Sequence, residues 1–268
     1  MKRVDKFKEG RRLANKAKYE GIKVETKTGV FEVVEYTNNE TVRIRFINTG
    51  YEKTVGLNSV KTGNVRDCTA QTVYGVGILG ETEFKTKGKE AKEYILWKNM
   101  LERCYCQQIK DKLPSYEFAT TSEDFKHFGK FISWCSNQIG YGCVDDKGRF
   151  FHLDKDILVK NNKTYSEETC VFIPQEVNAL FTHRRTNKGN CPVGVNFNRS
   201  KGRYEAYVSV GTNKARRHLG TFKTPEEAFY AYKEVKEQHI KDVANKWKDQ
   251  IDLRAYKALM NYQVEITD

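Results

Sequence analysis

The sequence predicts a multidomain α+β protein: a small N-terminal antiparallel β module, a central ββα hairpin-and-helix domain with flanking helices, and a C-terminal three-stranded sheet packed on one helix. Apolar and polar residues alternate in short runs between turn signals, and elsewhere apolar residues recur at three- and four-residue spacing. At 268 residues the chain is long enough for two or three modest cores. We expect an arm, three domains and a tail at 1–20, 21–80, 85–186, 189–247 and 248–268.

The N-terminal part combines a basic arm with a β module. Residues 1–18 carry eight basic and two acidic side chains and permit a helix. Between 29 and 67 the runs "VFEVVEY", "TVRIRFI" and "YEKTVGL" are separated by the turns "TNNE" and "NTG". Alternation places Arg43 and Arg45 on one face of a strand, opposite to Val42, Ile44 and Phe46. This module is predicted either to contact DNA or to serve as a structural cap.

A connector and two helices follow. The stretch "VYGVGILGETEFKTKGKE" (73–90) is rich in glycine and charge, which predicts a connector. Its glycines lack the Lys-Ser or Lys-Thr of a phosphate-cradling loop, which excludes that kind of nucleotide site. Residues 91–106 and 122–138 have helical apolar spacing, the second opened by a Thr or Ser cap. Their inward residues are predicted to be Tyr94, Trp97, Leu101, Cys104, Phe125, Phe128, Phe131, Ile132 and Cys135. We interpret them as core.

The stretch "HLDKDILVKNNKTYSEETCVFIPQEVNALF" (152–181) predicts a β-hairpin followed by a helix that begins at Pro174. On the first strand His152, Asp154 and Asp156 share one side, and Leu153 and Lys155 share the other. The helix carries Asn178. A strand carboxylate and a helix amide are hard oxygen ligands that suit Mg²⁺ or Mn²⁺, and such an ion stabilises charge at a scissile phosphate.

The C-terminal module begins after the polar stretch "TNKGNCP" (186–192), where we place a domain boundary. Three strands are predicted, "VGVNFN", "RYEAYVSV" and "ARRHLGTF", and then a helix with a capping box of Thr224, Pro225 and Glu227. The residues predicted to face inward are Tyr204, Ala206, Val208, Val210, Ala228, Ala231, Tyr232 and Val235. Those predicted to face outward on the last two strands are Arg203, Glu205, Tyr207, Ser209, Arg216 and His218. A polar, cationic sheet face of this kind can enter a major groove.

Charge and cysteine content narrow the class of protein. The net charge is +12, and between His183 and Phe222 nine basic residues stand against one acid. Such clustering favours phosphate binding over a merely solvated basic face. No apolar run is long enough to span a membrane, and no signal peptide is expected. Seven cysteines without a C-x-x-C pair predict reduced thiols, with neither a zinc site nor a disulfide framework.

The hairpin-and-helix stretch resembles the HNH endonuclease family, especially phage homing and orphan endonucleases. The resemblance runs through "LDKDI", "YSEETCVFIP" and "EVNALF", and upstream through "LWKNMLERCY". It implies that Asp154 and Asn178 bind the metal, that the general base falls at Lys155 and that a supporting Asn falls at Thr169. Both of the last positions depart from the family, and a lysine acts as a base only with a strongly depressed pKa. His152 is the alternative base; otherwise the site is catalytically inactive.

The C-terminal module resembles the plant ethylene-response-factor (APETALA-type) DNA-binding domain. The matching residues are Gly194, Val195, Gly202, Ala206, "HLGTF" (218–222), "PEEA" (225–228) and Tyr232. The resemblance implies DNA contacts by Asn196, Asn198, Tyr207, Ser209, Arg216 and His218. The neighbouring cations Arg199, Lys201, Arg203 and Lys214 are predicted to bind DNA with them.

Together these patterns predict a monomeric, site-selective endonuclease of double-stranded DNA that uses one Mg²⁺ or Mn²⁺ ion. A phage-encoded protein working in the bacterial cytoplasm, with no membrane partner, is expected. The alternative is a catalytically inactive DNA-binding regulator derived from such a nuclease. A third interpretation is an RNA-binding protein, although the outward sheet face lacks the paired aromatic residues of single-strand platforms.

Overall fold

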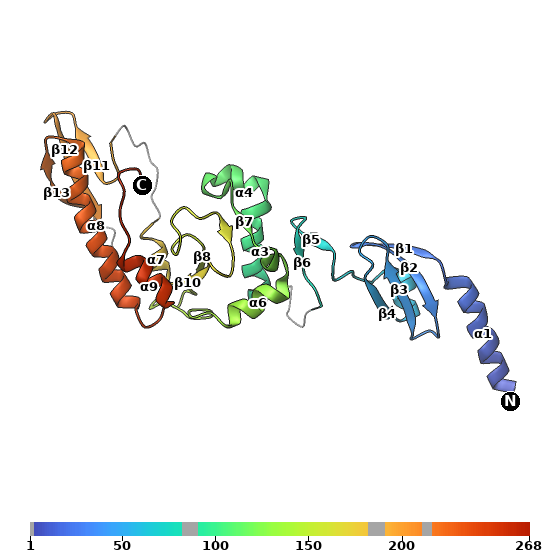
Figure 1. Ribbon diagram of the computed structural model, residues 1–268. Coiled ribbons are helices and arrows are strands. Elements are labelled where there is room, and N and C mark those ends of the chain that lie inside the picture. Colours follow the sequence, from blue (N-terminus) through green and yellow to red (C-terminus); the bar gives the residue numbers. More distant parts are fainter. Residues whose placement is uncertain (1–2, 82–90, 182–190, 211–215) are drawn as a thin grey trace. The chain divides into compact units, whose positions relative to one another are not determined.

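The computed structural model describes residues 3–81, 91–181, 191–210 and 216–268, apart from the side chains of 3–7 (Figure 1). The chain is α+β, with several small antiparallel sheets. It divides into two compact units, Met1–Ser133 and Trp134–Asp268. Within the described part of the chain, no helix combines the length and apolar character needed to cross a membrane.

The first unit opens with helix α1 (Arg3–Tyr19) and a four-stranded antiparallel sheet in the order β1-β2-β3-β4. The strands are β1 (Lys23–Thr26), β2 (Gly29–Tyr36), β3 (Val42–Phe46) and β4 (Glu52–Val55). The predicted alternation on β3 is confirmed: its apolar residues are buried, and Arg43 and Arg45 are exposed. Both arginines form ion pairs with Glu52. Helix α2 (Leu57–Thr62), which was not predicted, adds Leu57 and Val60 to the core.

The prediction of a connector over 73–90 is wrong at its N-terminal end. Strands β5 (Gln71–Val73) and β6 (Gly77–Ile78) form a hairpin, and Val73 and Leu79 are buried. A Cβ at Gly77 would lie 2.5 Å from Leu101 and 2.9 Å from Trp97, so the hairpin packs tightly on the following helix. Strands this short show no alternation, which is why the sequence pattern missed them. Residues 82–90 lie outside the described residues.

The two predicted aromatic helices are present, but the second is divided. Helix α3 (Lys92–Tyr105) buries Trp97, whose indole N–H donates to the carbonyl oxygen of Phe125 at 2.8 Å. Helix α4 (Gln107–Lys112), a 3-10 turn (Pro114–Tyr116) and β7 (Thr120–Thr121) follow. The single helix predicted at 122–138 is instead α5 (Glu123–Lys126) and α6 (Phe128–Ser136), because His127 is extended at φ −92° and ψ 115°. The predicted cap is confirmed at Ser122.

The second unit contains the predicted hairpin and helix. Strands β8 (His152–Asp154) and β10 (Val171–Ile173) pair antiparallel, with His152 opposite Ile173 and Asp154 opposite Val171. Strand β9 (Thr164–Tyr165) lies in the connection between them. Pro174 then precedes helix α7 (Gln175–Asn178), which contacts β8.

The same unit contains the predicted sheet in the order β11-β12-β13 and its helix. The strands are β11 (Val195–Asn198), β12 (Arg203–Ser209) and β13 (Arg216–Phe222), and α8 (Pro225–Trp247) packs on all three. The capping box is confirmed, with the Thr224 hydroxyl accepting from the backbone N–H of Glu227 and the Glu227 carboxylate accepting from that of Thr224. Helix α9 (Leu253–Met260) occupies the predicted tail.

Gly194 marks a tight approach between the sheet and α8. Its φ is +76°, and a Cβ there would lie 2.2 Å from the ring of Tyr232. We expect Gly194→Ala to lower the free energy of unfolding by about 2–5 kcal/mol, because a left-handed backbone and an overpacked core both oppose the methyl group. Gly202→Ala is the matched control: φ is +61° with open space around it, so about 1–2 kcal/mol is expected. Urea unfolding compares the two, and equal losses would contradict the packing argument.

Lys236 on α8 makes the stability depend on pH. Its buried Nζ donates to the carbonyl oxygen of Leu180 at 2.8 Å, and burial lowers its pKa from 10.5 to about 8. The unfolded chain therefore binds more protons than the folded chain between these pH values, and stability rises across that window. Relative to Lys236→Met, we expect wild type to gain about 3 kcal/mol between pH 7.5 and pH 10.5. Urea unfolding of both proteins at both pH values measures this. An equal change in unfolding free energy for wild type and Lys236→Met would refute it.

Candidate functional site

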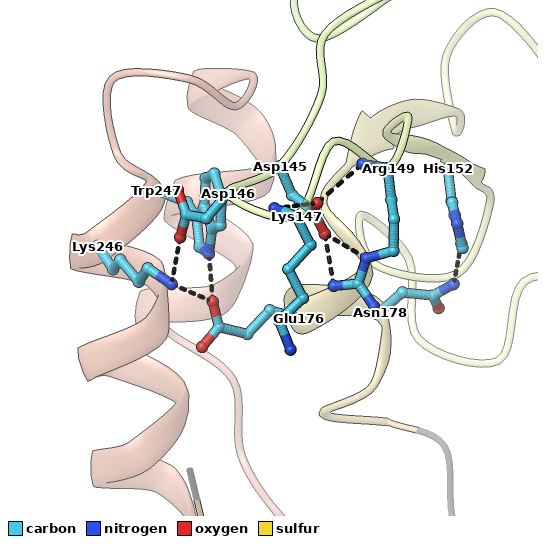
Figure 2. A network of polar contacts seen from close by, with 9 residues as sticks. All are labelled: Asp145, Asp146, Lys147, Arg149, His152, Glu176, Asn178, Lys246 and Trp247. Atoms are coloured by element: carbon cyan, nitrogen blue, oxygen red, sulfur yellow. Dashed lines mark hydrogen bonds and ion pairs between the residues drawn. The ribbon is translucent and has the colours of Figure 1, made fainter. Parts of the chain in front are cut away.

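The predicted metal-ligand residues lie on β8 and α7. Because α7 begins directly after the strand that pairs with β8, its last residue returns to the first strand. Asn178 Nδ2 lies 3.4 Å from His152 Nδ1, at an exposed position (Figure 2). The fold thus brings together a helix amide and a strand imidazole that are 26 residues apart in sequence.

Asp154 follows two residues after His152 on the same side of β8. Its Oδ1 accepts hydrogen bonds from the backbone N–H groups of Asp156 and Ile157, both at 2.8 Å. These bonds hold the carboxylate in a fixed position through one oxygen. Burial raises the pKa of Asp154, and the two backbone hydrogen bonds oppose that shift. A nearby cation would also favour the ionised form.

The side chain of Lys155, predicted as a candidate general base, contacts the loop that follows β8. The side chain is buried, on the side shared with Leu153 as alternation predicted. Its Nζ donates to Asp156 Oδ1 at 2.5 Å and to the carbonyl oxygen of Asn162 at 3.0 Å. To act as a base the ammonium would have to lose a proton and leave both partners, so these contacts favour a structural role, and the catalytic assignment of Lys155 stays a prediction.

Thr169, another predicted site residue, also has local hydrogen-bond partners. Its hydroxyl donates to the carbonyl oxygen of Thr164 at 2.8 Å and lies 3.0 Å from the Ser166 hydroxyl. Asn162, which the sequence analysis did not single out, bridges the same loop by donating to the carbonyl oxygens of Lys155 and Thr164 at 2.8 and 2.7 Å. These contacts make Thr169 part of the loop's support, and its catalytic assignment stays a prediction.

A second polar group lies just before β8. Asp145 accepts from the Nε and Nη2 atoms of Arg149, at 2.8 and 2.5 Å, and from the backbone N–H groups of Lys147 and Arg149 (Figure 2). The hydrogen bond from the Arg149 guanidinium is the main cause that lowers the pKa of Asp145 to about 2. The turn that enters β8 is therefore fixed by an ionised pair. Sequence reasoning missed it, since "DDKGR" has no period that signals such a pair.

The donor set fits a divalent ion held partly by its substrate. Among the described residues, no three His, Cys, Asp or Glu side chains gather as a ready-made metal cage. Mg²⁺ commonly takes only one or two carboxylates and completes its coordination with water and phosphate oxygens. Asp154 offers one carboxylate on β8 and Asn178 one amide at the end of α7, the kinds of donor that such a site uses.

The outward face of the β11–β13 sheet has a buried acid surrounded by donors. Glu205 accepts hydrogen bonds from Lys201 Nζ at 3.0 Å, from the Tyr207 hydroxyl at 2.8 Å and from Asn198 Nδ2 at 2.9 Å. Lys201, Tyr207 and Asn198, in that order, lower the pKa of Glu205 to about 2. Glu205 therefore faces outward as predicted, yet it is covered by three neighbours at 8% exposure.

Beside this cluster, the predicted DNA-binding residues of β12 and β13 stack on one another. Tyr207 pairs with His218 and Ser209 with Arg216 across the two strands. The Arg216 guanidinium lies 4.0 Å from the centre of the Tyr207 ring, and the Tyr207 and His218 rings lie 5.0 Å apart. With its amide turned to satisfy both groups, Asn196 accepts from Arg216. Arg199 and Arg203 are exposed near the preceding turn, and Lys214 lies outside the described residues.

Comparison of the chain with protein-family models, curated proteins and solved structures found no match.

Proposed function

We propose that this protein is a site-selective, metal-dependent DNA endonuclease of the HNH type that hydrolyses phosphodiester bonds of double-stranded DNA. The observation that carries the proposal is the hairpin-and-helix arrangement in which α7 brings Asn178 to within 3.4 Å of His152, two residues before Asp154. A cationic sheet face in the same unit supplies a surface for the DNA phosphates.

The site residues divide the chemistry between them. Asp154 and Asn178 would hold one Mg²⁺ or Mn²⁺ ion, which stabilises negative charge developing at the scissile phosphate. His152 is the favoured general base, because Lys155 is occupied in the loop. Asn178 Nδ2 lies 3.4 Å from His152 Nδ1, so the amide can hold the imidazole in place while the ring acts on the attacking water.

The outward face of the β11–β13 sheet would recognise the DNA sequence near the cleavage site. Tyr207, Arg216 and His218 form a continuous stacked group on the exposed side of β12 and β13. The Arg216 guanidinium and the His218 imidazole can donate to base edges or phosphates in a major groove. The four predicted cations Arg199, Lys201, Arg203 and Lys214 would add phosphate contacts that hold the register on the duplex.

A cleavage assay tests this proposal. Purified protein is incubated with supercoiled plasmid, phage DNA and host DNA in Mg²⁺, in Mn²⁺ and in EDTA, and nicked or linear products are measured. The proposal predicts products only with metal. Tight DNA binding without cleavage in either metal would instead support the inactive regulator, the alternative that the occupied Lys155 and Thr169 side chains favour.

Glu205→Gln is expected to weaken the discrimination between DNA sequences and to raise the affinity for DNA of any sequence. Glutamine keeps the size of the side chain but removes the charge that pairs with Lys201. It also replaces one of the two carboxylate oxygens, which accept separately from Asn198 and Tyr207, with an amide donor. We expect stronger binding to random DNA, a steeper dependence of affinity on salt, and weaker discrimination between sequences. Kd values for preferred and random duplexes at several salt concentrations measure this. Unchanged discrimination would show that the Glu205 cluster does not position DNA contacts.

A further inference from the structure

Helix α8 joins the two sites of the second unit. It is continuous from Pro225 to Trp247, with its N-terminus fixed by the capping box. Near that end, Ala228 and Tyr232 are buried, and the Tyr232 ring lies directly against Gly194 at the start of β11. The first part of α8 thus belongs to the core beneath the β11–β13 sheet.

The C-terminal end of α8 is anchored to α7, the helix that carries Asn178. Lys246 Nζ lies 2.6 Å from Glu176 Oε2, and the indole N–H of Trp247 donates to the same oxygen at 2.9 Å (Figure 2). Lys246 also pairs with Asp146 at 3.2 Å, and Trp247 packs edge-on against Phe151. Glu176 precedes Asn178 by two residues, so these contacts fix the helix that carries the proposed metal ligand.

The middle of α8 is braced by the C-terminal segment. Lys233 Nζ donates to the carbonyl oxygen of Val264 at 2.7 Å, and Glu237 accepts from the Val264 backbone N–H at 2.8 Å. Farther along, the Tyr256 hydroxyl of α9 donates to Asn245 at 3.0 Å. Bending α8 would break these contacts as well as its own hydrogen bonds.

We propose that α8 is a rigid spacer that fixes the distance between the bases recognised by the β11–β13 sheet and the phosphate cut at β8 and α7. This inference rests on the proposed nuclease function. At 1.5 Å per residue, the 23-residue helix spans about 35 Å. That length corresponds to about 10 base pairs of B-form DNA. The cut therefore lies within about one helical turn of the recognised bases, at a constant spacing.

The test compares footprints with cut positions on the same end-labelled duplexes. Hydroxyl-radical footprints of the full chain without metal locate the protected bases, and Mg²⁺ or Mn²⁺ is then added to map nicks at nucleotide resolution. We expect one spacing of about 10 base pairs or less at every site. Scattered spacings in the wild type would overturn the inference while leaving the nuclease proposal intact. Footprints without any nicks would refute the nuclease proposal and the spacer with it.

Variants of the Glu176 anchor make the test specific. Glu176→Gln and Lys246→Met are expected to keep the footprint and spread the nicks over several neighbouring positions, because α7 is then less firmly held. Lys246→Arg should retain the single spacing. Lys241→Met is the matched control for Lys246→Met, because it removes one positive charge elsewhere on the same helix. Circular dichroism and footprint affinity confirm folding of each variant. A single, unchanged spacing in Glu176→Gln and Lys246→Met would overturn the spacer role.

Discussion

Replacing Trp247 with alanine is expected to lower the free energy of unfolding of the second unit by about 3–5 kcal/mol. The side chain is 2% exposed, and its ring meets Phe151 edge-on at 5.7 Å. Its indole N–H also donates to Glu176, so truncation would remove a hydrogen bond to a charged group as well as leave a cavity. The contacts connect α8 with α7 and with the segment before β8, and we expect the hairpin and the sheet to unfold in one transition.

Urea unfolding followed by circular dichroism measures the loss, and hydrogen exchange of amides in β8 and β12 shows whether the two regions open together. Trp247→Phe is the matched control, since it keeps an aromatic ring and removes the N–H; a loss of about 1.5–3 kcal/mol is expected. A loss below about 1 kcal/mol for Trp247→Ala, or early opening of the hairpin in the wild type, would contradict the account of α8 as a shared core element.

Asp154→Asn is expected to reduce metal-dependent nicking by about 100-fold or more, with DNA binding retained. The amide oxygen of asparagine can still accept from the backbone N–H groups of Asp156 and Ile157, so the turn after β8 is preserved. The negative charge that attracts a divalent ion is lost. Because the substitution leaves the sheet face untouched, affinity for DNA should change little.

The elements predicted from the sequence are those with a strong local signal. The two faces of β3 and the capped start of α8 were predicted, and the hairpin with α7 followed from two apolar runs, a turn and Pro174. These signals depend on neighbouring residues alone. Short elements such as α2 and the β5–β6 hairpin have too few residues to show a period, and the break at His127 lies within an uninterrupted apolar pattern.

The candidate site was predictable in part. Alternation placed His152 and Asp154 on one side of β8 and Lys155 on the buried side. It could not show that Lys155 is occupied by Asp156 and Asn162, because the return of the loop decides that contact. The anchor between Glu176 and Lys246 joins residues 70 positions apart. No local pattern encodes such a pair, so it emerges only from the tertiary packing of α8.

The most direct test of the nuclease proposal compares two carboxylates two residues apart. Asp154 is the proposed metal ligand, whereas Asp156 is exposed and pairs with Lys155. Wild type, Asp154→Asn and Asp156→Asn are assayed for nicking of supercoiled DNA over time in Mg²⁺ and in Mn²⁺, with DNA binding measured in parallel. The account predicts metal-dependent nicking by wild type and Asp156→Asn, and binding without nicking by Asp154→Asn. Wild-type nicking rates in Asp154→Asn, or binding without nicking by all three proteins, would contradict it.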